Sequence, residues 1–143
     1  MEEKISEKQL ALDERYLRMA KIWAENSYCK RRQVGALVVK DKMIVSDGYN
    51  GTPSGFDNIC EDQEGLTLPY VLHAEANAIT KLACSHNSSV GSTLYVTTAP
   101  CIECAKLIIQ AGISRVVYSD KYRIEDGIHL MQKAGVEVVN IRV

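Results

Sequence analysis

The sequence of 143 residues has no long apolar run and no surplus of charge of either sign. A membrane-spanning helix needs about 20 consecutive apolar residues, and the polar start Met1-Glu2-Glu3-Lys4 lacks the apolar core of a secretion signal. Lys and Arg number 17 against 18 Asp and Glu, for a net charge of -1, so no basic field indicates nucleic acid. We therefore expect a cytoplasmic protein with neither a membrane nor a nucleic-acid partner.

The sequence lacks an even set of cysteines: it has five, an odd number that does not divide into a closed set of disulfides. Cys101 and Cys104 stand in a Cys-x-x-Cys motif, which is typical of metal and redox sites. We therefore predict a reducing compartment without a disulfide framework. Cys84 lies on the apolar side of a predicted helix, and we expect it to be a small core residue.

Hydrophobic periodicity predicts helices that alternate with strands. A first helix is expected over residues 6–27, with Trp23 in the core, and the turn Asp41-Lys42 joins two strands into an antiparallel hairpin. The predicted strands cover 34–39, 43–49, 93–98, 115–118 and 136–140, and the later helices cover 74–83, 101–111 and 124–134. This alternation favours an α/β protein with three layers, α/β/α, around a mixed five-stranded sheet. No repeat or linker divides the chain, so residues 1–143 are predicted to form a single domain.

Two short motifs carry candidate metal ligands, His73-Ala74-Glu75 and Pro100-Cys101-Ile102-Glu103-Cys104. One imidazole and two thiolates are three of the four ligands of tetrahedral Zn²⁺, and a catalytic zinc site leaves the fourth position open. Both motifs begin predicted helices, where the partial positive charge favours thiolates. We predict that His73, Cys101 and Cys104 bind zinc, which lowers the pKa of a water molecule towards about 7.

Glu75 lies two residues beyond His73 and is not needed as a ligand. A carboxylate in this place can take a proton from water and pass it to a substrate. Hydrolytic deamination needs such a relay, because a ring nitrogen and the departing amine must both gain protons. A structural zinc knuckle or a redox pair is the alternative for a lone Cys-x-x-Cys motif.

The segment after the predicted hairpin is dense in turn formers and hydroxyl groups, Gly48-Tyr49-Asn50-Gly51-Thr52-Pro53-Ser54-Gly55. Its glycines allow close approach to a ligand, and successive N–H groups can cradle an anion, although a plain surface loop fits equally well. Residues 56–70 follow as a long connection without regular structure. Such connections are usually lids or binding loops, so we expect this one to cover a pocket or to reach a neighbouring subunit.

Four segments together resemble the deoxycytidylate (dCMP) deaminase family: Tyr49–Gly55, His73–Glu75, Pro100–Lys106 and Ser119–Tyr122. His-x-Glu with Pro-Cys-x-x-Cys is the signature of zinc deaminases in general, and the Asn-Gly-x-Pro-x-Gly loop narrows the likeness to the nucleotide-specific branch. The resemblance implies a cytidine deaminase-like fold and the hydrolysis of dCMP to dUMP and ammonia, which supplies dUMP for dTTP synthesis. It also implies a homo-oligomer, a hexamer in many members, activated by dCTP and inhibited by dTTP, with Mg²⁺ accompanying the effector.

The resemblance implies roles for residues around the substrate. Asn50 matches a residue that hydrogen-bonds the sugar 3′-hydroxyl, Tyr122 matches a tyrosine at the pocket, and the backbone N–H of Ala74 is expected to read the pyrimidine edge. A phosphate needs charge-assisted donors, and the candidates are Arg31, Arg32, Ser54 and Lys121. For the two arginines, contact with the C-terminal dipole of the first helix is the alternative. The candidate effector-binding residues are Gly51, Thr52, Pro53 and Gly55.

Some relatives carry a second, structural zinc, and Cys29 and Cys60 match two of its ligands. The other two ligands have no match, because Val71 stands where a Glu is expected. Glu61, Asp62 or a water molecule would have to complete the site, so we expect one zinc ion for each chain.

Other functions share parts of this pattern. Cytidine deaminase and guanine deaminase make little use of the Asn-Gly loop, and a tRNA adenosine deaminase is expected to show a basic surface for RNA. A zinc-stabilised interaction module without activity leaves Glu75 unexplained. For the oligomer, we expect the apolar face of the predicted zinc helix, Leu107-Ile108-Ile109, to pack against another subunit.

Overall fold

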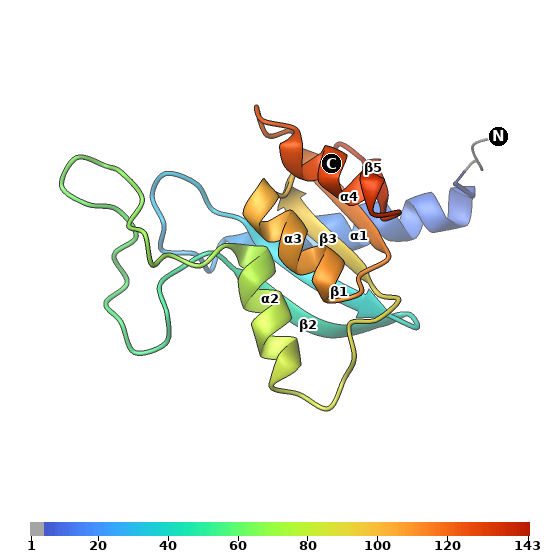
Figure 1. Ribbon diagram of the computed structural model, residues 1–143, viewed down its shortest axis with the longest axis horizontal. Helices are drawn as coiled ribbons and strands as arrows, with labels where there is room; N and C mark the ends of the chain where they lie inside the picture. The colour runs from blue at the N-terminus through green and yellow to red at the C-terminus, as the bar shows by residue number, and fades with distance from the viewer. Residues whose placement is uncertain (1–4) are drawn as a thin grey trace.

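The computed structural model describes residues 5–143 and shows a five-stranded sheet between two layers of helices (Figure 1). Along the chain the elements are α1 (Glu7–Ala24), β1 (Gly35–Lys40), β2 (Met43–Tyr49), α2 (Ala74–Ala83), β3 (Thr93–Thr98), α3 (Ile102–Gln110), β4 (Arg115–Asp120), α4 (Asp126–Lys133) and β5 (Glu137–Asn140). The strand order is β2-β1-β3-β4-β5, and β1 pairs antiparallel with both of its neighbours while β3, β4 and β5 run parallel. The predicted α/β class and mixed five-stranded sheet are confirmed.

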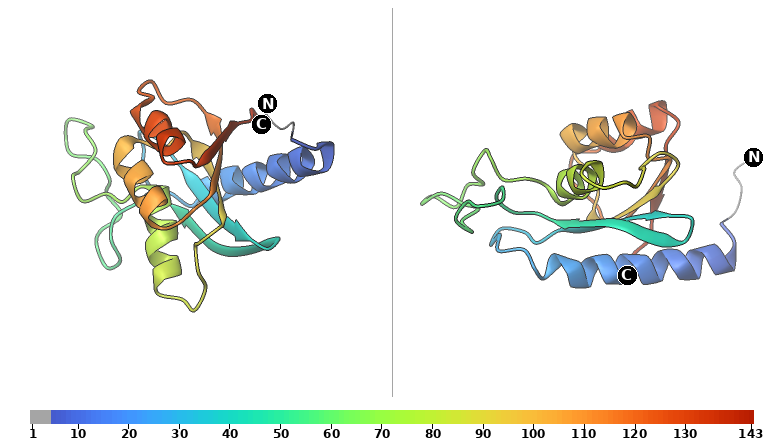
Figure 2. Two further views of the ribbon diagram at one scale, coloured as in Figure 1. Left: turned by 45° about the vertical axis from the view of Figure 1, so that its right-hand side comes forward. Right: turned by 90° about the horizontal axis from the view of Figure 1, so that it is seen from below.

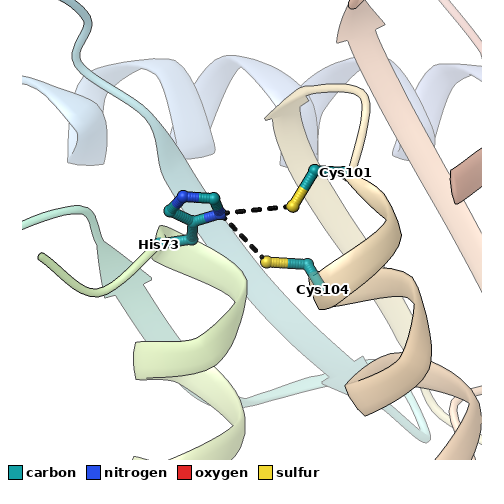
Figure 3. A group of neighbouring side chains, drawn as sticks. All are labelled: His73, Cys101 and Cys104. Carbon is teal, nitrogen blue, oxygen red and sulfur yellow. Dashed lines mark hydrogen bonds between the residues drawn. The ribbon is translucent and has the colours of Figure 1, made fainter. Parts of the chain in front are cut away.

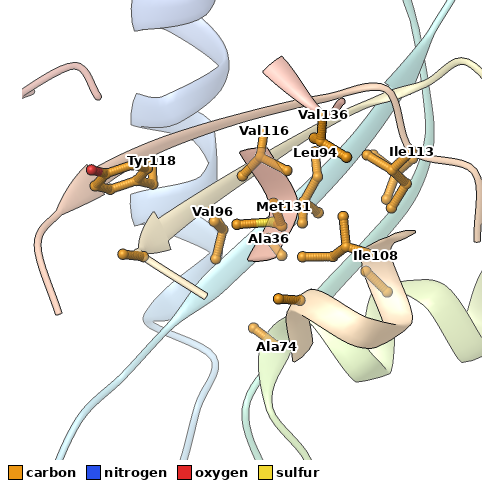
Figure 4. Close-up of a cluster of buried hydrophobic side chains, with 14 of the residues drawn as sticks. Ala36, Ala74, Leu94, Val96, Ile108, Ile113, Val116, Tyr118, Met131 and Val136 are labelled. Carbon is orange, nitrogen blue, oxygen red and sulfur yellow. The ribbon is translucent and has the colours of Figure 1, made fainter. Parts of the chain in front are cut away.

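The helices divide unequally between the two faces of the sheet. Figure 2 shows α1 along one face and α2, α3 and α4 on the other. Alternate residues of each central strand therefore enter different cores. Leu37, Tyr95 and Val117 pack towards α1, whereas Val96 and its neighbours pack towards α2, α3 and α4 (Figure 4). The second of these cores lies directly beneath the two predicted zinc motifs.

Helix α1 begins where the sequence predicts, because the hydroxyl of Ser6 accepts a hydrogen bond from the backbone N–H of Gln9 at 3.1 Å. Its buried side is formed by Asp13, Leu17, Ala20 and Ala24. Trp23 lies outside this stripe. It is 38% exposed, and its indole N–H donates to Asp47 of β2 at 3.1 Å, so the prediction of a core tryptophan is wrong.

A buried carboxylate holds α1 onto the sheet. Asp13 is fully buried and accepts hydrogen bonds from Gln9 at 2.9 Å, from the Tyr95 hydroxyl at 2.6 Å and from two nitrogens of Arg115 at 2.8 and 2.7 Å. Burial by itself raises the pKa of Asp13, but the hydrogen bonds from Arg115, Tyr95 and Gln9 outweigh it and lower the pKa. Asp13 therefore links α1 to β3 and β4 as an ion.

We expect Asp13→Ala to lower the free energy of unfolding by about 3–5 kcal/mol, because it leaves the Arg115 guanidinium buried beside an empty space. A carboxylate whose pKa is lowered on folding stabilises the protein above the unfolded pKa of about 3.9 and loses this effect as the pH falls through the folded pKa. Urea unfolding of the two proteins should therefore differ at pH 7 and converge in acid. Glu14→Ala, an exposed change on the same helix, is the control, and similar losses in both variants would contradict this account.

Two other expectations about cysteine are wrong. Cys29 and Cys60 form a disulfide, with their Cα atoms 5.2 Å apart, although no disulfide was predicted. The bond joins the segment after α1 to the long connection of residues 56–70, which projects from the body of the fold (Figure 1). Cys84 is exposed at the end of α2 rather than part of the core.

No helix within residues 5–143 combines the length and hydropathy that a bilayer crossing requires.

Candidate metal centre and active site

Three predicted metal ligands meet where α2 and α3 begin. His73 is the N-cap residue of α2 and Cys101 is that of α3, and neither side chain forms a capping hydrogen bond. Both side chains are therefore free to face each other. The Nδ1 atom of His73 lies 3.2 Å from Sγ of Cys104 and 3.5 Å from Sγ of Cys101 (Figure 3).

This cluster fits a zinc ion. All three ligand atoms lie within 4.8 Å of one another. In a tetrahedral site with ordinary zinc–sulfur and zinc–nitrogen bonds, a nitrogen and a sulfur ligand are about 3.5 Å apart, close to the two separations in this cluster. One nitrogen and two sulfurs leave one tetrahedral position for a further ligand, as in catalytic zinc sites.

The pKa values of the three clustered side chains are shifted in different directions. Hydrogen bonds from Cys104 and His73 lower the pKa of Cys101 to about 3. The matching bond to Cys101, together with burial, raises the pKa of Cys104, and the hydrogen bond to Cys101 raises the pKa of His73. The cluster thus holds a thiolate at Cys101, and the binding of a cation by all three residues requires the protons of Cys104 and His73 to leave.

Glu75 lies in the first turn of α2, 4% exposed, beside the cluster. Burial raises its pKa to about 7. A carboxyl group with a pKa near neutrality can both accept and return a proton during a reaction. Its position in the first helical turn, two residues after His73, places it on the wall of the same cavity.

Two glycines bring the elements of the site together. A Cβ atom on Gly48 of β2 would lie 2.5 Å from the carbonyl oxygen of Ala74, and one on Gly127 of α4 would lie 2.4 Å from that of Pro100. Only glycine allows α2 to approach β2, and α4 to approach the turn before α3, this closely. The glycine at position 48 thus serves helix packing rather than contact with a ligand.

Backbone bonds then place the start of α2. Gly51 and Leu72 exchange two hydrogen bonds, of 3.0 and 2.7 Å. This short bridge sets the direction of the chain immediately before His73. The loop after β2 is therefore part of the structure that positions the cluster.

A cavity of about 390 Å³ opens above the cluster. This volume lies in the usual range for small-molecule sites. The structure brings eight of the residues predicted for the metal, the catalysis or the substrate together on its wall: Arg31, Arg32, Asn50, His73, Ala74, Glu75, Cys101 and Tyr122. Cys29, a candidate ligand of a second zinc, lines it as well. Cys104 lies next to the cavity in the metal cluster. Two residues of the long connection, Glu61 and Thr67, also line the cavity, so this connection forms part of the pocket wall.

Asn50 has contacts that the sequence does not predict. Its side-chain oxygen accepts from the N–H of Val34 at 2.8 Å, and its side-chain nitrogen donates to the carbonyl of Arg32, also at 2.8 Å. The amide can still offer a second N–H to a ligand. Asn50 therefore holds the backbone at Arg32 and Val34 in place while it lines the cavity.

Other predicted residues lie outside the cavity wall. They are Ser54, Lys121 and the candidate effector residues Gly51, Thr52, Pro53 and Gly55. Thr52 donates a hydrogen bond to the carbonyl of Asp57 at 3.0 Å, and Gly55 has φ +88°, so both help to shape the loop. Their roles towards a phosphate or an effector stay predictions.

A second zinc ion was not expected at Cys29 and Cys60, because the sequence offers only two of the four ligands that some relatives use. Cys29, Cys60 and Glu61 have ligand atoms within 4.8 Å of one another. The disulfide, however, uses both sulfurs. In this state neither cysteine is a thiolate, which is the form that binds zinc.

Thr98 is a residue of the site that the sequence analysis missed. It ends β3, two residues before Pro100, and it lines the cavity. It alternates in phase with Val96, so it points to the face covered by α2 and α3. Its position at the carboxyl end of a parallel strand, where α/β proteins bind ligands, is the signal that identifies it.

Comparisons with known proteins agree with this geometry. Residues 10–120 match the family described as the cytidine and deoxycytidylate deaminase zinc-binding region. The chain is 40% identical over 120 residues to the deoxycytidylate deaminase of Mycobacterium phage D29, across 74% of this chain and 92% of that protein. It is 41% identical over 123 residues to the human deoxycytidylate deaminase, across 79% and 67%. The crystal structure of dCMP deaminase from the cyanophage S-TIM5, in complex with dCMP and dUMP, matches with a TM-score of 0.90 at 46% identity, across 96% of this chain and 100% of that chain.

Proposed function

Because the chain belongs to the cytidine and deoxycytidylate deaminase zinc-binding family, we propose that it hydrolyses dCMP to dUMP and ammonia. The observation that carries this proposal is the placement of Glu75 beside the cluster of His73, Cys101 and Cys104, at the wall of one cavity. The likeness to a dCMP deaminase whose structure contains both dCMP and dUMP supports the choice of substrate.

His73, Cys101 and Cys104 would hold a zinc ion, which when bound acts as a Lewis acid and lowers the pKa of a water molecule. Deamination adds water at C4 of the pyrimidine, protonates N3 and releases the amine as ammonia. Glu75 would move the protons: it accepts one from the water and delivers it to N3, then takes the second from the new C4 hydroxyl and delivers it to the amine, which leaves as the C4–N bond breaks and the C4 carbonyl forms. Its pKa of about 7 suits both directions of transfer.

The cavity supports a nucleotide rather than a nucleoside. Arg31 and Arg32 line it, and within residues 5–143 neither forms an ion pair. Both side chains are largely exposed and are free to donate charge-assisted hydrogen bonds to a phosphate. The predicted phosphate-binding role of the two arginines is kept on these grounds.

The test is ammonia release and loss of cytosine absorbance with dCMP, deoxycytidine, dCTP and adenosine in parallel, with and without a zinc chelator. We expect kcat/KM for dCMP to exceed that for deoxycytidine by about 100-fold, because charge-assisted phosphate contacts are strong, and turnover to stop on chelation. A preference for deoxycytidine or adenosine would contradict the proposed substrate. Turnover that survives removal of zinc would contradict the proposed chemistry.

We further propose a cytoplasmic homo-oligomer, a hexamer, activated by dCTP and inhibited by dTTP with Mg²⁺ at the loop of residues 51–55. Apolar side chains exposed on α3, Ile102 and Leu107, support an interface at this helix. Ile108, predicted to face a partner, is instead fully buried in the chain's own core. The interface proposed for α3 therefore excludes this residue.

A further inference from the structure

The carboxylate of Glu61 holds the backbone of the basic segment Lys30-Arg31-Arg32. It accepts hydrogen bonds from the N–H of Lys30 at 3.1 and 3.3 Å and from the N–H of Arg31 at 3.3 Å. Glu61 lies 30 residues further along the chain, in the connection that runs beside this segment (Figure 1). Two consecutive N–H groups that meet one carboxylate fix the local backbone, because both donors are satisfied by one partly buried group.

Glu61 itself is held from both sides. The adjacent Cys60 is bonded to Cys29, next to Lys30. Glu61 also pairs with Thr67, and Cys60 accepts a hydrogen bond of 2.7 Å from the N–H of Leu68. The backbone that carries the Glu61 carboxylate is therefore held by the disulfide and by pairing with Thr67 and Leu68.

The two ends of the basic segment have different anchors. Glu61 bonds to Lys30 and Arg31, whereas Asn50 bonds to Arg32 and Val34. Between them, the exposed side chains of Arg31 and Arg32 reach the wall of the cavity. A ligand that binds these arginines meets a segment that is already ordered, which reduces the entropy lost on binding.

We propose that Glu61 is a positioning residue for the nucleotide phosphate, and that it acts by fixing the backbone from which Arg31 reaches into the cavity. This inference rests on the proposed function, because it assumes a phosphate at the arginines. Glu61 does not need to touch the substrate. Its own charge repels a phosphate, so the inference predicts that removing this charge weakens nucleotide binding, the opposite of a purely Coulombic effect.

The test uses the zinc-loaded protein of 143 residues and its variants Glu61→Gln and Glu61→Ala. Lost bonds from two backbone donors to a charged acceptor should raise KM for dCMP about tenfold in Glu61→Ala, and less in Glu61→Gln, whose side-chain oxygen still accepts. The value of kcat for dCMP and kcat/KM for deoxycytidine should stay within about twofold of wild type. Glu64→Ala, an exposed change on the same connection, should change neither.

A double-mutant cycle shows whether Glu61 acts through Arg31. If it does, adding Glu61→Ala to Arg31→Ala should raise KM for dCMP little beyond the single arginine variant, because coupled residues are not additive. If the increases in KM caused by Glu61→Ala and by Arg31→Ala multiply in the double variant, the two residues act independently and the inference is overturned. So would a lowered KM in Glu61→Gln, which would mean that the carboxylate competes with the phosphate for the two N–H groups.

Equal losses of kcat/KM for dCMP and for deoxycytidine would also overturn the inference, because they would show that Glu61 has a merely structural role. Glu61→Gln keeps the shape of the side chain, so the comparison remains available if Glu61→Ala does not fold. Failure of the proposed function gives a different result. In that case the wild-type protein itself would not prefer dCMP.

Discussion

Glu75→Gln is expected to retain one zinc ion for each chain and to lose about 10³- to 10⁴-fold in kcat for dCMP, near the upper end of what general acid–base catalysis contributes. Gln has the shape of Glu but carries no proton between water, N3 and the leaving amine. The metal stays because Glu75 is not one of the three clustered ligands. The measurements are the rate of loss of cytosine absorbance and the zinc content of the purified variant.

Glu103→Gln is the matched control for this variant. Glu103 lies in the first turn of α3, as Glu75 lies in the first turn of α2, but it is exposed and forms an ion pair with Lys106 at 2.7 Å. We expect this control to keep nearly full activity. A Glu75→Gln protein that retains most of the wild-type kcat would remove the proton relay from the proposed mechanism.

Cys101→Ala should lose both the metal and the activity. Cys101 is the N-cap residue of α3 and one of the three residues in the cluster, so the loss of its thiol leaves two ligands for the ion. Metal affinity contributes to folding stability when the ligands come from separate elements. We expect less than about a tenth of the wild-type zinc content and a Tm lower by about 5 °C or more, since a change of 1 kcal/mol shifts Tm by several degrees in a domain of this size.

Cys84→Ala separates this effect from the general loss of a thiol. Cys84 is a free and exposed cysteine at the end of α2, and its replacement should change neither zinc content nor Tm. Treatment of the wild-type protein with a chelator should reproduce the loss of stability seen in Cys101→Ala. Full zinc occupancy in Cys101→Ala would show that the ligand set is wrong.

The order of the elements was predictable because its signals are local. The expected bounds agree with the structure within a few residues; α1, for example, was expected over 6–27 and spans Glu7–Ala24. A cap at Ser6, the turn at Asp41-Lys42 and the glycine after α3 each act over one turn of chain. Family membership was also readable, since the motifs that carry it are short and contiguous.

The faces of the helices were less predictable. Trp23, Cys84 and Ile108 were each assigned to the wrong environment. Periodicity identifies a stripe of apolar residues but does not determine which edge of it meets the sheet and which meets solvent. That depends on how each helix is rotated against its neighbours, which is a property of packing.

By itself, the sequence determined the alternation of helices and strands, the family and the residue types that can hold zinc, because these depend on neighbours a few positions apart. Only the tertiary structure brought Cys60 to Cys29, Glu61 to the backbone of Arg31 and Asn50 to Arg32. These contacts join residues 18 to 31 positions apart, across loops with no periodic pattern. Such pairings arise only when the sheet and helices have set the path of the chain, since a loop is placed by the elements at its two ends.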